Sequence, residues 1–113
     1  MVRLFNKLVL LLFLLIKFKL MDKFEIKCIN KSNRLSPSER IESIGGINYN
    51  NTRWRLTVSR AIEGIEMGKW AFFVRVGLVN VNVIISSHNG VKYLKTSNDG
   101  IEPNNLLSLP ECL

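Results

Sequence analysis

The clearest strand-forming segment of the chain runs from Trp70 to Thr96 and reads WAFFVRVGLVNVNVIISSHNGVKYLKT. Through residues 70–76, 79–86 and 91–96, side chains alternate with a period of two, which is typical of half-buried strands. A glycine separates the first two strands, and His88-Asn89-Gly90 is a strong hairpin signal. Because both connections are short, we expect an antiparallel meander. Its inward face carries Trp70, Phe72, Val81, Val83 and either Tyr93 or Leu94.

Immediately before this stretch, the apolar period is that of a helix. Thr57 or Ser59 can accept a hydrogen bond from the first turn, and Gly68 is placed to end the helix. The apolar face consists of Val58, Ala61, Ile62 and Ile65. We therefore expect a helix over residues 58–67 that packs on the inward face of the sheet.

Two further strands are predicted upstream of this helix. Residues 24–29 alternate between apolar and polar side chains, and so do residues 52–57. The apolar faces are formed by Phe24, Ile26 and Cys28 in the first strand and by Trp54 and Leu56 in the second, where Arg53 and Arg55 point outward.

A short helix is predicted between these two strands. Ser36 has the position of an N-cap, Pro37 that of the first helical residue, and Glu39 that of the capping-box partner. Gly45-Gly46 is placed to end the helix. The expectation is a helix of about two turns near residues 37–44.

The order of these elements predicts a small α+β domain of two layers. We expect a mainly antiparallel sheet of about four to five strands, with the main helix (58–67) packed on it. The tail at 103–110 is apolar enough to pack back on the domain, and its two prolines keep it out of a central strand. A chain of 113 residues, 47% hydrophobic, is the right size for one such domain.

The first 20 residues differ in composition from the rest. Leu8–Ile16 is an unbroken apolar run between Lys7 and Lys17, and it is too short to cross a bilayer by itself. Three interpretations stay open: a secretory signal, an uncleaved membrane anchor, or upstream sequence preceding a true start at Met21. We accordingly divide the chain into a hydrophobic basic leader, 1–20, and a domain, 21–113.

The net charge of +7 overstates the basicity of that domain. The leader holds four basic residues and no acidic ones, so residues 21–113 carry only +3. An electrostatic footprint for nucleic acid needs a denser basic surface than this.

The closing part of the domain resembles a known bacterial family. YLKT at residues 93–96 is followed three positions later by Asp99, and the tail contains NLLSLP at residues 105–110. In this order the motifs resemble the domain of unknown function 3892 over residues 24–112. Similar chains begin close to Met21, which favours the alternative start. The resemblance implies no particular activity.

Polar residues gather where the last predicted strand meets the tail. The carboxylate of Asp99 can meet Lys95 or Asn104 at one edge of the sheet. The competing interpretation is that Asp99 forms an Asx-turn and that the asparagines are turn formers. The candidate contact region for a ligand or a protein partner consists of Lys95, Asp99, Asn104 and Asn105.

Basic and aromatic residues also interleave in two strands. In sheets that bind nucleic acid, aromatic rings stack on bases while Lys and Arg meet phosphates. Trp54 is expected to point inward, however, and solvated charge on an outer face is the simpler explanation. The alternative of a weak nucleic-acid binder uses Arg53, Arg55, Lys92 and Tyr93.

The two cysteines and the single histidine give little support to catalysis. Cys28 and Cys112 lie at opposite ends of the domain and become neighbours only if the tail returns to the first strand. In a cytoplasmic protein we expect them to be reduced. His88 is predicted in a turn, away from either thiol, and the Cys and His spacing forms no zinc module. We expect no catalytic residue, metal or cofactor.

The function that these patterns favour is a non-catalytic binding or accessory module in the cytoplasm. The alternatives are the weak nucleic-acid binder and a membrane-tethered or secreted form of the same domain that retains residues 1–20. The sequence names neither a ligand nor a partner.

Overall fold

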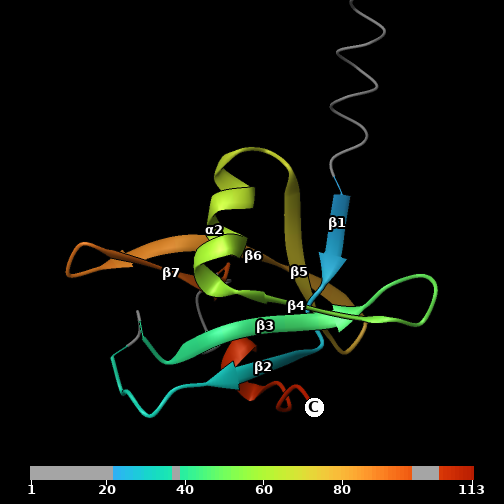
Figure 1. Cartoon of the computed structure of the whole chain (residues 1–113), viewed down its shortest axis with the longest axis horizontal. Helices are drawn as coiled ribbons and strands as arrows, with labels where there is room; N and C mark the ends of the chain where they lie inside the picture. The colour runs from blue at the N-terminus through green and yellow to red at the C-terminus, as the bar shows by residue number, and fades with distance from the viewer. Residues whose placement is uncertain (1–21, 37–38, 98–104) are drawn as a thin grey trace, which may run out of the picture.

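The computed structural model of the protein describes residues 22–36, 39–97 and 105–113. Seven strands, one α-helix and one 3-10 helix are found in these residues (Figure 1). They are β1 (Asp22–Glu25), β2 (Cys28–Lys31), β3 (Ile41–Ile47), β4 (Arg53–Thr57), α2 (Val58–Glu66), β5 (Trp70–Val76), β6 (Val79–His88), β7 (Val91–Thr96) and η1 (Asn105–Ser108).

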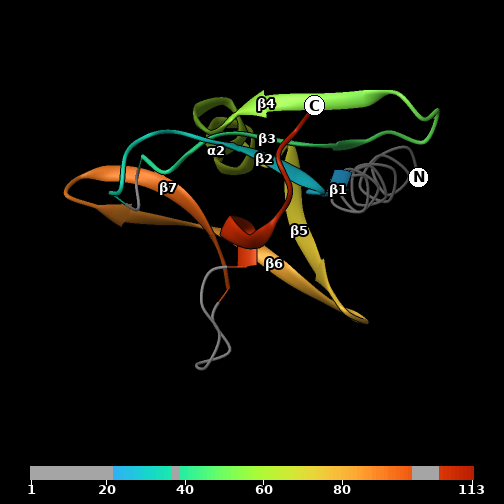
Figure 2. The ribbon, with the colours of Figure 1, turned by 90° about the horizontal axis from the view of Figure 1, so that it is seen from below.

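The strands form two sheets instead of the single sheet expected. The larger has the order β1-β5-β6-β7, with β1 parallel to β5 and the other pairs antiparallel. The smaller is antiparallel, with the order β2-β3-β4. Figure 2 shows the smaller sheet on one side of the molecule and β5, β6 and β7 on the other. The fold class is α+β, as predicted.

The meander over 70–96 is confirmed, and so is its tight second turn. Asn89 and Gly90 both have positive φ, 51° and 78°, which matches the twist that a two-residue hairpin requires. Of the two alternatives for the inward position, Leu94 is the buried one, whereas Tyr93, on the opposite face of β7, is half-buried.

The helix is confirmed over Val58–Glu66. Thr57 is its N-cap, because the Thr57 hydroxyl accepts a hydrogen bond from the Arg60 backbone N–H at 3.2 Å. Gly68 follows the helix with φ of 71°. The helix packs against Trp70, whose Nε1 donates to the Ala61 carbonyl at 3.2 Å.

The predicted strand over 24–29 is wrong, because it is two strands in different sheets. The Ile26 N–H donates to the Phe73 carbonyl beside β5, whereas the Lys27 N–H donates to the Gly45 carbonyl in β3. The chain changes sheets between these two residues. Ile26 consequently points into the core, and Cys28 lies on the opposite, outer face of the smaller sheet.

The predicted short helix near 37–44 is also wrong. Residues Ile41–Ile47 form β3, the central strand of the smaller sheet, and Pro37-Ser38 lie outside the described residues. The Glu39 N–H donates to the Ser36 carbonyl at 2.9 Å in a turn that does not continue as a helix. The capping signal is local, and the pairing of β3 with a strand on each side overrides it.

The core lies between the two sheets and α2. The described residues that are buried in it include Ile29 and Ile44 from the smaller sheet, Phe72, Val74, Val83 and Leu94 from the larger sheet, and Ile26 from the connection between β1 and β2. Leu106, in η1, joins this core and fixes the described part of the tail to the domain. The tail packs back as expected.

Within the described residues, no helix has the length and apolar content to cross a membrane. The leader at 1–20 lies outside these residues.

Candidate functional site

The outer face of the smaller sheet is the most distinctive surface of the molecule. Across its strands, Cys28 lies opposite Gly45, which lies opposite Arg55. Two residues further along the same strands, Ile47 lies opposite Arg53. Because directly opposed residues share a face, these side chains lie on one side of the sheet.

The C-terminal tail is held on this surface by a disulfide between Cys28 and Cys112. Their Cα atoms are 4.9 Å apart, and 84 positions separate them in the sequence. The prediction that both cysteines are reduced thiols is therefore wrong for this structure. That prediction rested on a cytoplasmic location; the tail does return to β2, where Glu111 pairs with Ile29, and this return brings the two sulfur atoms together.

Gly45 provides the space for the disulfide. A Cβ atom at this position would lie 2.9 Å from each of the two sulfur atoms, closer than packed side chains approach. Gly45, interpreted from the sequence as a helix terminator, is thus the residue on which the Cys28–Cys112 disulfide packs.

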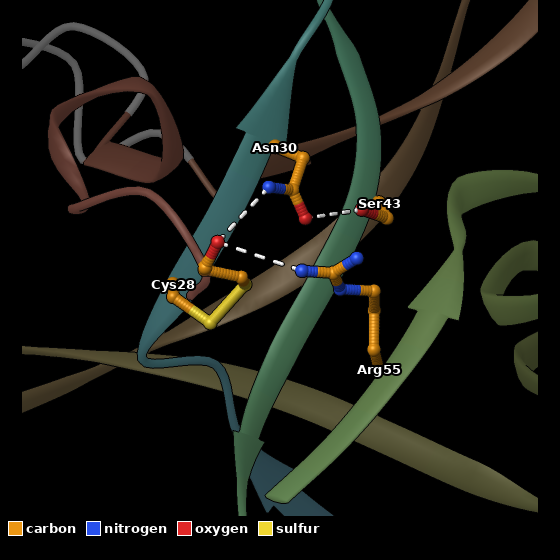
Figure 3. The surroundings of a disulfide bond; sticks show 5 residues. Cys28, Asn30, Ser43 and Arg55 are labelled. Atoms are coloured by element: carbon orange, nitrogen blue, oxygen red, sulfur yellow. Dashed lines mark hydrogen bonds between the residues drawn. A yellow bond between two sulfur atoms is a disulfide. The ribbon is translucent and has the colours of Figure 1, made fainter.

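Polar bonds complete the attachment of the tail (Figure 3). The Cys112 carbonyl accepts from Asn30 Nδ2 at 3.3 Å and from Arg55 Nη2 at 3.5 Å. Asn30 is itself oriented by Ser43, whose hydroxyl donates to Asn30 Oδ1 at 2.7 Å. The backbone adds bonds from the Ile29 N–H to Pro110 and from the Cys112 N–H to Ile29, so the tail extends the sheet beyond β2.

A groove of about 240 Å³ lies beside the disulfide. Its walls come from the turn between β1 and β2, from β3 and β4, and from the tail. Three cationic side chains line it, Lys27, Arg53 and Arg55, and all three residues are exposed. The acidic residue in its lining is Glu111.

These cations are only weakly engaged within the protein. Among the described residues, Lys27 and Arg53 make no side-chain hydrogen bond or ion pair, and Arg55 makes only the 3.5 Å contact to Cys112. A guanidinium carries five N–H donors in a planar fork that matches a carboxylate. The groove therefore offers cationic donors beside the apolar side chain of Ile47 and the disulfide.

A second, apolar cavity of about 170 Å³ lies on the inner side of β4. Trp54 packs there at 5.7 Å, centroid to centroid, from both Phe24 and Phe72, and Trp70 completes the aromatic lining. The buried Trp54 Nε1 has no hydrogen-bond partner among the described residues. Gly46 makes room for the indole, since a Cβ there would lie 2.7 Å from Nε1.

The contact region predicted at the end of β7 is only partly described. Lys95 is half-buried in β7 opposite Ile84, and Asn105 begins η1. Asp99 and Asn104 lie outside the described residues, so this candidate site stays a prediction.

The structure separates the predicted nucleic-acid residues. Arg53 and Arg55 lie on β4 in the smaller sheet, while Lys92 and Tyr93 lie on β7 in the larger one. Lys92 forms an ion pair with Glu66 of α2. The aromatic ring between the two arginines, Trp54, points to the inner side and does not offer a stacking platform beside them.

Within the part of the chain that the structure describes, no three His, Cys, Asp or Glu side chains are grouped to hold a metal ion. His88 ends β6 at the hairpin and lies outside the groove lining.

Sequence reasoning identified the outward arginines of β4 but missed Lys27, Glu111 and the tail as parts of the same surface. The only usable signal was the pair of cysteines, one at each end of the domain.

The family model described as "Protein of unknown function (DUF3892)" matches residues 25–110, and the chain belongs to this family. The search of curated proteins and the search of solved structures each found no match. The family description assigns no activity.

Proposed function

We propose that this domain is a non-catalytic binding module that recognises an acidic segment of a partner protein at the groove beside the disulfide. The observation that carries this proposal is that Lys27, Arg53 and Arg55 line one groove, and that most of their N–H donors make no hydrogen bond to the described residues. Exposed cations of this kind gain charge-assisted hydrogen bonds when a carboxylate arrives.

The shape of the groove supports the same conclusion. Its lining contains the disulfide and Ile47 beside the three cations, so a ligand can bury apolar atoms while its carboxylates meet the cations. Salt weakens interactions between exposed charges, so the affinity for an acidic ligand should fall as ionic strength rises.

The chemistry of the groove favours binding over catalysis. Both cysteines are in the disulfide and offer no thiolate nucleophile. Neither a histidine nor a metal-binding cluster is found among the described residues that line the groove. The groove presents three cationic side chains, which are suited to binding an acidic ligand.

Fluorescence anisotropy with a labelled acidic peptide tests this proposal. Arg55→Ala should weaken binding roughly tenfold, about 1.4 kcal/mol. Lys92→Ala is the matched control, because it removes a cation from β7 that already pairs with Glu66, and it should leave affinity unchanged. An acidic peptide that fails to bind at low salt would contradict the proposal.

A labelled single-stranded oligonucleotide serves as the competing ligand in the same assay. Tighter binding of the oligonucleotide than of the acidic peptide, lost in Arg53→Ala and Arg55→Ala, would replace the proposed partner with nucleic acid. We expect the peptide to bind more tightly, because Trp54 is turned away from the two arginines and cannot stack on a base.

The disulfide bears on the compartment in which the module works. Disulfides persist in oxidising compartments and are rare in the cytoplasm. The Cys28–Cys112 bond therefore favours the exported or membrane-tethered alternative over the cytoplasmic location expected from the sequence.

A further inference from the structure

Strand β4 lies at the border of the smaller sheet and pairs, among the described strands, only with β3 (Figure 2). The Asn48 N–H donates to the Thr52 carbonyl at 2.8 Å, so Asn48 and Thr52 form a hydrogen-bonded pair at the hairpin between β3 and β4. Counting from this pair, every second residue pair along the two strands is hydrogen-bonded, including Gly46 with Trp54. In an antiparallel ladder, every second residue turns its backbone groups toward the partner strand. Trp54 therefore bonds to β3, and the N–H and C=O groups of Arg53 and Arg55 face the open edge.

The two faces of this edge differ in chemistry. On the outer face stand the side chains of Arg53 and Arg55, two positions apart. On the inner face, between them along the strand, Trp54 opens onto the aromatic cavity of about 170 Å³. A charged row and an apolar pocket thus alternate with the period of a strand.

We propose that β4 accepts an extended peptide as an added strand, in which acidic side chains alternate with apolar ones. This inference rests on the proposed function and specifies its partner and its mode of binding. Strand addition gains affinity from main-chain hydrogen bonds and specificity from pockets for alternate side chains.

The register of the added strand follows from the edge. Peptide residues opposite Arg53 and Arg55 exchange backbone hydrogen bonds with them, and their side chains lie on the arginine face. These positions take Asp or Glu. The residue between them points to the inner face, where the cavity is large enough for a branched aliphatic side chain or a phenyl ring, since an apolar cavity of about 150 Å³ holds benzene.

A second copy of this chain is a poor occupant of the same edge. Antiparallel pairing of β4 with β4 would bring arginines face to face, and like charges directly opposite one another destabilise a strand pair. The arginines thus disfavour self-association and favour a partner of opposite charge.

Synthetic peptides test the mode of binding. The probe is a labelled peptide with the core glutamate–leucine–glutamate, titrated with the intact protein. N-methylation of the two glutamate nitrogens removes the N–H groups that face β4 and should weaken binding more than tenfold. N-methylation of the leucine nitrogen, which faces away from β4, is the matched control and should change affinity less than twofold.

Two further arms test the side-chain contacts. Binding of the leucine peptide should shift the tryptophan emission, because Trp54 and Trp70 both line the cavity. Replacing the leucine with serine should abolish this shift and weaken binding about tenfold. The double variant Arg53→Glu with Arg55→Glu should reject the glutamate peptide and bind a lysine–leucine–lysine peptide, which shows that the variant is folded and that charge sets the preference.

The outcomes separate this inference from the proposed function. If the peptide binds through the arginines but both N-methylated forms bind equally well, strand addition is overturned and the acidic-segment module stands. If no acidic peptide binds, both fail. If sedimentation shows a dimer that Trp54→Asp dissociates while the folded monomer binds no peptide, the occupant of the edge is a second copy.

Discussion

Cutting the bond between Cys28 and Cys112 should cost this domain a large part of its stability. The change is the double substitution Cys28→Ala with Cys112→Ala, compared with reduction of the unaltered protein. We expect either treatment to lower the free energy of unfolding by about 4 kcal/mol. The reason is entropic: without the bond, the unfolded chain regains the freedom of a loop that spans nearly the whole domain.

The magnitude follows from the length of that loop. The two cysteines are 84 positions apart, and the chain-entropy relation for a loop of this length gives about 4.6 kcal/mol at 25 °C. Domains of this size are typically stable by about 5–15 kcal/mol, so the uncrosslinked domain should be close to the limit of folding. The tail keeps its buried Leu106 and its two backbone bonds to Ile29, which argue for a weakened native state over a wholly unfolded one.

Urea unfolding followed by tryptophan fluorescence measures the change, because Trp54 and Trp70 both pack in the aromatic cluster. Three samples are compared: the oxidised protein, the same protein in dithiothreitol, and the double-alanine variant. The last two should agree within about 1 kcal/mol, and both should show a steeper dependence on urea, because an uncrosslinked unfolded chain exposes more surface.

Two results would contradict a stabilising role for the loop constraint. A loss below about 1 kcal/mol in both samples would mean that the non-covalent contacts of the tail suffice and that the loop constraint contributes little. A loss in the alanine variant but not on reduction would assign the effect to the void left beside Gly45, since only the substitution removes the sulfur atoms.

Three further predictions concern the helix, the tail and the native chain. Gly64→Ala should destabilise the domain by about 1–3 kcal/mol, because the added Cβ would lie 1.9 Å from the Trp70 ring. This loss should outweigh the gain of about 1 kcal/mol that alanine brings to a helix. A variant that is more stable in urea unfolding would contradict the packing of Trp70 on Gly64. Leu106→Ala should cost about 3–5 kcal/mol and speed hydrogen exchange at the Cys112 amide, and slow exchange there would show that the tail does not depend on this anchor. Mass spectrometry of the protein from its native source should find the two cysteines oxidised, and a fully reduced chain that starts at Met21 would contradict the exported location.

Signals that act within a few residues predicted their elements well. Asn89-Gly90 identified the hairpin because few other residues tolerate positive φ at both central positions. Thr57 and Gly68 marked the ends of α2 because a hydroxyl at the start and a left-handed glycine at the end satisfy backbone groups locally. In each case the physics that selects the residue involves only its neighbours in sequence.

The change of sheet after Ile26 shows where such reasoning stops. Alternation placed Ile26 and Cys28 on one face, and a continuous strand would have kept them there. Instead, Ile26 pairs beside β5 and Lys27 pairs with β3, so the next side chains change direction relative to the core. The identity of the partner strand decides this point, and that partner lies far away in the sequence.

The candidate site was hidden by the interpretation of a single dipeptide. Gly45-Gly46 has the composition of a helix end, and Ser36 with Glu39 supplies a matching start, so the local signals agree with one another. In the folded chain the glycines are instead the two places where β3 must carry no side chain. One gives space to the sulfur atoms of the outer face, and the other gives space to the indole of Trp54 on the inner face. Once β3 is assigned as a strand, Arg55 comes to lie opposite Gly45 and Cys28, and the groove, the disulfide and the open edge of β4 follow from the same register.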